Sequence, residues 1–135
     1  PKSVESRQTY IVSLGQTETY AAIGQEVARE LLKEWLVYFR IGQNTPLPFF
    51  AKTSLAAAEE DSKKEDWDAA LRKAHEVFNG NKMSKGQKEY TEVKLVFGHS
   101  EESPLDEPLF ENLIVNLLVP LLNSVAGKNN ATEQE

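Results

Sequence analysis

The sequence predicts an α+β fold that is dominated by helices and completed by a small sheet. Apolar residues recur every three or four positions over most of the chain, which is typical of amphipathic helices. Two short stretches, Thr9–Leu14 and Thr91–Phe97, instead carry the β-branched and aromatic residues that favour strands. Glycines and prolines stand between these segments and mark their ends. We therefore expect the two stretches to share the small sheet.

Length and composition indicate one domain. The chain has 135 residues, of which 40 % are hydrophobic and 27 % are charged, and this is enough to build a core. We expect the domain to occupy residues 1–126 and a disordered tail to occupy residues 127–135. Because the chain starts at Pro1 and its only methionine is Met83, we expect it to be a fragment of a longer protein. It has no cysteine, which excludes disulfides and thiolate metal sites.

The charge balance argues against a free-standing nucleic-acid binder. The net charge is −6, whereas such binders usually show a basic face. We therefore expect contact with DNA only as part of a larger body. No apolar run approaches the eighteen or so residues of a membrane span, and no phosphate loop is present. The sequence predicts no membrane partner, no cofactor and a cytoplasmic location.

The first third of the chain predicts a strand and a long helix. The strand Thr9–Leu14 stops at Gly15, after which the hydroxyl of Thr17 or Thr19 is suited to cap a helix. Gly42 favours the left-handed turn that ends a helix. The apolar stripe of this helix consists of Ile23, Val27, Leu31, Trp35, Tyr38 and Phe39.

Two shorter helices follow a proline-rich segment, residues 41–54. The two prolines of this segment keep it out of a helix. The first short helix is expected to start at the Thr53–Ser54 pair. The second is capped by Asp66 and ends at Gly80. Its stripe consists of Trp67, Ala70, Leu71, Ala74 and Phe78.

The last third predicts a loop, a strand and a buried helix. Residues 79–90 contain two glycines and no apolar period, so we expect a loop. Thr91–Phe97 alternates like a half-buried strand. Asp106 is a plausible cap for the final helix, Pro108 falls in its first turn, and Pro120 predicts a kink. That helix is apolar around most of its girth, which indicates burial from several sides.

Catalytic chemistry has one candidate, Glu92-x-Lys94. On a strand this pair would share one face, as in metal-dependent nucleases of the PD-(D/E)xK type. A magnesium site needs a further carboxylate, and no convincing upstream aspartate precedes Glu92. The favoured interpretation is an exposed charged face. His75 and His99 lack metal-ligand spacing and are interpreted as surface residues.

Two binding candidates remain open. Lys82, Lys85 and Lys88 make residues 79–90 locally basic, and they either contact a phosphate backbone or lie in solvent. The proline-rich segment presents several apolar side chains on a stretch without helix. These four residues, Leu47, Pro48, Phe49 and Phe50, either pack inside the domain or contact another chain.

Two motifs resemble a known family. The pattern G-x-N-x-PLPFF-x-KTS-x-A covers residues 42–56, and SPLDE-x-LFENL covers residues 103–113. In this order and spacing they resemble the C-terminal region of the exodeoxyribonuclease V gamma subunit, RecC, over residues 11–125. The sequence departs from the family at Leu55, where a tryptophan often follows the KTS motif.

This resemblance implies a role that composition does not show. RecC joins RecB and RecD in a helicase–nuclease complex that repairs double-strand breaks. Its C-terminal region resembles a PD-(D/E)xK nuclease that has lost its active site. The resemblance implies RecB-like and RecD-like partners, DNA within the whole complex, and a non-catalytic structural segment that supports subunit contacts and duplex splitting. Two alternatives stay open: an active metal-dependent nuclease using Glu92 and Lys94, and an unrelated helical protein-interaction module.

Overall fold

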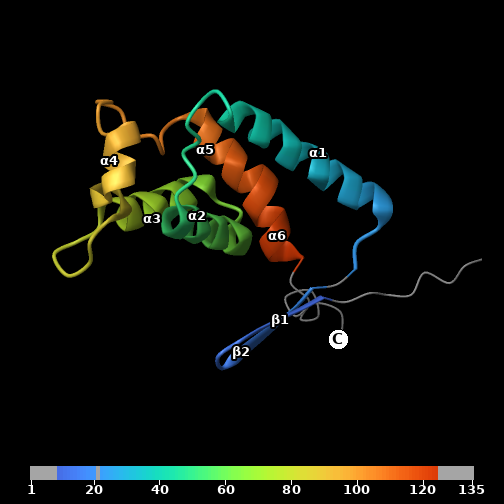
Figure 1. Ribbon diagram of the computed structural model, residues 1–135. Helices are drawn as coiled ribbons and strands as arrows, with labels where there is room; N and C mark the ends of the chain where they lie inside the picture. The colour runs from blue at the N-terminus through green and yellow to red at the C-terminus, as the bar shows by residue number, and fades with distance from the viewer. Residues whose placement is uncertain (1–8, 21, 125–135) are drawn as a thin grey trace, which may run out of the picture.

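The computed structural model describes residues 9–20 and 22–124 and confirms a helix-dominated α+β architecture (Figure 1). The tail expected at residues 127–135 lies outside this part of the chain. The elements, in order, are β1 (Thr9–Ser13), β2 (Gln16–Tyr20), α1 (Gln25–Gly42), α2 (Ala51–Lys64), α3 (Trp67–Asn79), the 3-10 helix η1 (Gln87–Glu89), α4 (Thr91–Phe97), α5 (Pro108–Leu113), the π-helical segment η2 (Ile114–Leu118) and α6 (Val119–Asn123).

The sheet is a single hairpin, β1 paired antiparallel with β2. Ser13 pairs with Gln16, so two residues make the turn, and the second of them, Gly15, has a φ of 81° that favours glycine. The predicted helix start at Thr17 or Thr19 was wrong. Both threonines lie in β2, because the turn reverses the chain and alternating β-branched residues suit a strand. Helix α1 begins only at Gln25.

The second predicted strand was also wrong, since Thr91–Phe97 is helix α4. The Lys94 N–H donates to the Tyr90 carbonyl at 3.0 Å, which closes a helical turn. Val93 and Phe97, four residues apart, pack against the core, whereas Leu95 between them is 71 % exposed. Seven residues are too few for period two to be told from period 3.6, and here the helical pair is the one that reaches the core. The predicted sheet of Thr9–Leu14 with Thr91–Phe97 therefore does not form.

Helices α2 and α3 form a tight antiparallel hairpin. Ala57 and Ala58 of α2 and Ala70 and Ala74 of α3 are fully buried, and these small side chains let the two helices approach closely. The predicted cap is confirmed, because the Asp66 side chain accepts a hydrogen bond from the Ala69 N–H at 3.1 Å. The predicted helix end at Gly80 is confirmed too, with a left-handed φ of 71°.

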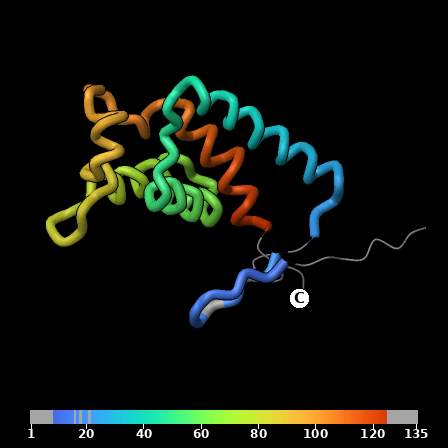
Figure 2. Tube along the Cα trace, in the orientation of Figure 1, coloured from blue at the N-terminus to red at the C-terminus, as the bar shows by residue number. Residues whose placement is uncertain are grey.

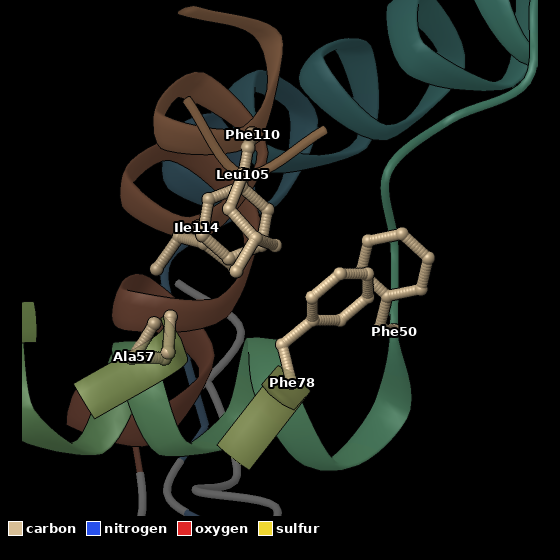
Figure 3. Close-up of a cluster of buried hydrophobic side chains, with 8 residues drawn as sticks. Phe50, Ala57, Phe78, Leu105, Phe110 and Ile114 are labelled. Carbon is tan, nitrogen blue, oxygen red and sulfur yellow. The ribbon is translucent and has the colours of Figure 1, made fainter. Parts of the chain in front are cut away.

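The last helix lies between α1 and the α2–α3 hairpin, so the helices form three layers (Figure 2). One side of it contributes Phe110 and Ile114 to the main core, in which the tilted rings of Phe50 and Phe78 lie 4.9 Å apart between centroids (Figure 3). The other side contributes Leu113 and Leu117 to a smaller cluster with α1. This confirms the predicted burial from several sides.

The last helix starts differently than predicted and contains a π-helical segment. Asp106 does not cap it; the cap position is Glu107, and the Asp106 carboxylate instead bonds the His75 ring at 2.8 Å. The helix runs through the π-helical segment η2, where the Val119 N–H donates to the Ile114 carbonyl. Pro120, which has no N–H and a ring that crowds the preceding turn, lies two residues after this segment. The kink expected at Pro120 stays a prediction.

Candidate functional site

The proline-rich segment divides between core and surface. Pro48 and Phe50 are buried, and the Phe50 ring also meets Phe97 edge-on at 5.3 Å. Phe49, the neighbouring residue, is 43 % exposed, and Leu47 is half-buried. Of the four candidate interface residues, only Leu47 and Phe49 therefore retain surface for a partner.

Leu47 and Phe49 line an apolar hollow of about 230 Å³. Its other walls come from α1 and from the last helix. The lining consists of Trp35, Tyr38, Phe39, Leu47, Phe49, Leu113 and Leu117. The floor is fixed in place, because Tyr38 is buried and its hydroxyl accepts a hydrogen bond from the Asn116 amide at 2.9 Å. A rigid, nearly all-apolar depression of this kind fits an inserted hydrophobic side chain.

The hollow continues into an exposed stripe on α1. We call Leu32, Trp35, Leu36 and Phe39 the outer stripe; they stand at positions i, i+3, i+4 and i+7 and so share one side of the helix. Each is between 43 and 63 % exposed. The only buried residue of α1 is Tyr38. Helix α1 therefore uses one narrow edge for its own fold and leaves a broad apolar face open.

The polar side of α1 carries two ion pairs. Lys33 contacts Glu30 at 2.5 Å, and Arg29 contacts Glu26 at 3.7 Å. Exposed pairs of this spacing contribute little to stability, a few tenths of a kcal/mol each. They do keep this side hydrated, so the outer stripe is the side of α1 that is suited to dock.

The nuclease candidates Glu92 and Lys94 are not brought together. Two residues apart on α4, they lie on different sides of the helix. Lys94 instead contacts Glu89 at 2.7 Å, and this hydrogen bond is the main reason that the pKa of Glu89 is lowered. Within residues 9–20 and 22–124, no three His, Asp or Glu side chains are close enough together to hold a metal ion.

The three predicted lysines differ in their contacts. Lys88 donates to the Asn79 side chain at 3.0 Å, and Lys82 is exposed at the tip of the loop. Lys85 turns towards Tyr90, with its ammonium 5.8 Å from the ring centroid. It lines a second hollow, of about 200 Å³, together with Lys52 and Lys73. No sequence signal marks Lys52 and Lys73, because they come from α2 and α3 and meet Lys85 only in the fold.

The second hollow is tied to the start of α2 through Gln87. The Gln87 side-chain oxygen accepts a hydrogen bond from the Thr53 N–H at 2.7 Å, which satisfies one of the open donors of the first turn. Next to it, the Ser54 hydroxyl accepts from the Phe50 N–H at 3.0 Å. The fully buried Thr53 hydroxyl has no hydrogen-bond partner among the described residues.

We expect Thr53→Val to raise the free energy of unfolding by about 1 kcal/mol, because valine keeps the shape and removes a buried polar atom without a partner. Urea denaturation measures this change. Ser54→Ala is the matched control; it removes a hydroxyl that is used, and should lower the free energy of unfolding by about 1 kcal/mol. Equal losses in both variants would show that the Thr53 hydroxyl is bonded after all.

Within the described residues, none of the helices combines the length and the apolar character needed to cross a bilayer. Residues 10–62 match the family model of the RecC C-terminal domain, which confirms the resemblance over this range. No curated protein and no solved structure matches the chain. The matched range holds the hairpin, α1, the proline-rich segment and most of α2, and so includes the whole outer stripe.

Proposed function

We propose, from the RecC-like character of residues 10–62, that the chain is a non-catalytic segment of a RecC-like subunit in a RecBCD-type helicase–nuclease complex. In this role it acts in the cytoplasm in double-strand break repair, and its contribution is to hold partner subunits, RecB-like and RecD-like, around the DNA. The contact surface is the outer stripe of α1 together with the apolar hollow beside Leu47 and Phe49.

The observation that carries this proposal is the uncovered apolar face of α1. Four large side chains on one side of an 18-residue helix are each close to half exposed or more, and they continue into a hollow with almost no polar lining. Contiguous apolar surface of this kind is costly to leave in water and is typical of interaction sites. The partner that fits is an apolar helix or loop that inserts a side chain between Trp35 and Phe49.

The non-catalytic part of the proposal is supported by the position of Glu92 and Lys94. A metal-holding pair needs both side chains directed at one point, whereas these two lie on different sides of α4. A degenerate PD-(D/E)xK fold remains a prediction of the family resemblance. Mg²⁺-dependent DNA cleavage that is lost in Glu92→Ala would contradict the proposal and favour an active nuclease.

The test is association with the helicase subunits. We expect Leu36→Asp, and likewise Leu32→Asp, to weaken binding of the tagged chain to purified RecB-like and RecD-like subunits of the same source by tenfold or more, because each places a charge in a desolvated apolar contact. Interferometry or a quantitative pull-down measures the affinity, and circular dichroism checks that the helices remain folded.

Leu95→Asp is the matched control, since it makes the same change at a more exposed site on α4, outside the range that matches the family. Binding that is equally weak in all three variants would indicate a general charge effect. Binding unchanged in Leu32→Asp and Leu36→Asp would rule out the outer stripe as the contact surface.

A further inference from the structure

We propose that the hollow lined by Lys52, Lys73 and Lys85 binds the phosphate backbone of a DNA strand without reading its sequence. The inference rests on the proposed function for the choice of DNA among polyanions. The site differs from the candidate formed by the loop lysines alone, because Lys52 and Lys73 of the helical body take the place of Lys82 and Lys88.

The three lysines come from separate elements, and two of them, Lys52 and Lys85, meet at the Tyr90 side chain. Lys52 stands in the first turn of α2, Lys73 in the middle of α3, and Lys85 in the loop that returns towards η1. The Lys52 ammonium lies 3.5 Å from the Tyr90 hydroxyl, and the Lys85 ammonium lies 5.8 Å from the centroid of the same ring. The fold thus holds two positive charges at one half-buried aromatic side chain.

The polar lining of the hollow is biased towards hydrogen-bond donors. The Asn81 side-chain oxygen already accepts from the N–H groups of Met83 and Ser84, at 2.9 and 2.8 Å. The Gln87 side-chain oxygen accepts from the Thr53 N–H. Because both amide oxygens face N–H donors, each amide group has its NH₂ left as a donor. The Ser84 carbonyl is likewise occupied, by the Asn81 N–H at 2.9 Å. The hollow therefore offers a ligand N–H donors, while its amide oxygens and the Ser84 carbonyl already have hydrogen-bond partners. Such a lining is suited to an anion.

The local charge is positive in a chain with a net charge of −6. Glu76 is the one carboxylate that lines the hollow, and it is paired with Lys73 at 3.0 Å. The neighbouring Glu89 is held by Lys94. Across residues 9–20 and 22–124, neither Lys52 nor Lys85 forms an ion pair with a carboxylate. The charge of Lys85 does act on Glu89, where it helps to lower the pKa of that carboxyl. Two ammonium groups without a direct carboxylate partner therefore remain for a ligand.

The residue types favour phosphates over bases. Lysine is a flexible point charge that binds a phosphate oxygen from several directions. The hollow has no arginine, whose rigid fork is better suited than lysine to fixed bidentate contacts. Contacts of this class position a strand, carry no sequence information and depend strongly on salt.

The experiment is fluorescence anisotropy of a labelled twenty-nucleotide thymidine strand, titrated with the chain at several salt concentrations from about 50 mM upwards. Each lost phosphate contact to a single strand reduces the slope of log affinity against log salt by about 0.7. We expect Lys52→Gln with Lys85→Gln to reduce the slope by about 1.4 and to weaken binding about tenfold or more at the lowest salt. Repeating the titration with a mixed-sequence strand should give the same affinity.

Two control variants remove the same charge elsewhere. Lys33→Gln with Lys63→Gln acts on α1 and the end of α2, and Lys82→Gln with Lys88→Gln acts on the loop lysines outside the hollow. Equal weakening of DNA binding in all three double variants would show that only net charge matters, and would overturn the proposal. A larger loss of DNA affinity in the Lys82→Gln, Lys88→Gln variant than in the Lys52→Gln, Lys85→Gln variant would also overturn it. Equally tight binding of labelled polyglutamate through Lys52 and Lys85 would assign the site to an acidic protein instead.

The two proposals fail separately. If the outer-stripe variants bind the helicase subunits more weakly, and the substitutions at Lys52 and Lys85 leave the DNA affinity unchanged, only the phosphate site is wrong. If DNA binding follows Lys52 and Lys85 while the outer-stripe variants still bind the subunits, only the proposed contact surface is wrong.

Discussion

Replacing Phe50 with alanine should lower the free energy of unfolding by about 3–5 kcal/mol, the range measured for buried phenylalanines. Its ring is 5 % exposed and touches two other rings, Phe78 at 4.9 Å and Phe97 at 5.3 Å. These partners belong to α3 and α4. The cavity left by the substitution would therefore open where the proline-rich segment, α3 and α4 meet, and no single neighbouring side chain could fill it. Chemical denaturation followed by circular dichroism measures the loss.

Phe49→Ala is the control, because it is the same substitution one residue earlier in the chain. Its side chain is 43 % exposed in the rim of the apolar hollow, so Phe49→Ala should cost under about 1 kcal/mol of stability. The same variant should weaken the binding of helicase subunits, whereas it leaves the fold intact. Equal stability losses in the two variants would contradict the division of the proline-rich segment into a core half and a surface half.

The sequence predicts most of the helices because their apolar stripes are long, or because a residue with a known physical role, such as a capping aspartate, marks the helix end. The stripe of α1 repeats over more than four turns, and α3 has both a capping aspartate and a terminal glycine at the predicted places. The hairpin shows where such reasoning fails. The sequence pattern marks Gly15 as the end of a strand, but a glycine with positive φ equally allows a two-residue turn between two strands. Helix α4 fails for a different reason, since seven residues fit both periods and only the position of the core decides.

The candidate sites likewise contain some residues that the local sequence can identify and others that become neighbours only in the folded chain. Leu47 and Phe49 could be selected from sequence because apolar residues beside prolines are unusual on a surface, but which of the adjacent phenylalanines turns inward depends on the position of α3. Lys85 could be selected because its loop is locally basic. Lys52 and Lys73 could not, because they are separated from Lys85 by 33 and 12 residues and become its neighbours only when α2 packs on α3.

Gly86→Ala should destabilise the protein by about 3 kcal/mol, at the upper end of the cost of overpacking. The reason is space alone, because the backbone of Gly86, with φ of −72° and ψ of 157°, is open to any residue. A methyl group there would lie 2.3 Å from the Phe78 carbonyl oxygen and from the Asn79 carbonyl carbon. These are backbone atoms at the end of α3, and they cannot yield without moving the buried Phe78 ring.

Gly24→Ala is the control for this prediction, since a methyl group placed at Gly24 meets no atom within 4 Å among the described residues beyond its two chain neighbours. It should cost under about 1 kcal/mol, the scale of a weaker helix cap. The Gly86 variant also tests how the phosphate site is built, because Gly86 stands between Lys85 and Gln87 and keeps the loop against α3. Its DNA affinity should therefore fall together with its stability. A variant that is destabilised but binds the strand as tightly as the native chain would show that the hollow does not depend on this close backbone approach.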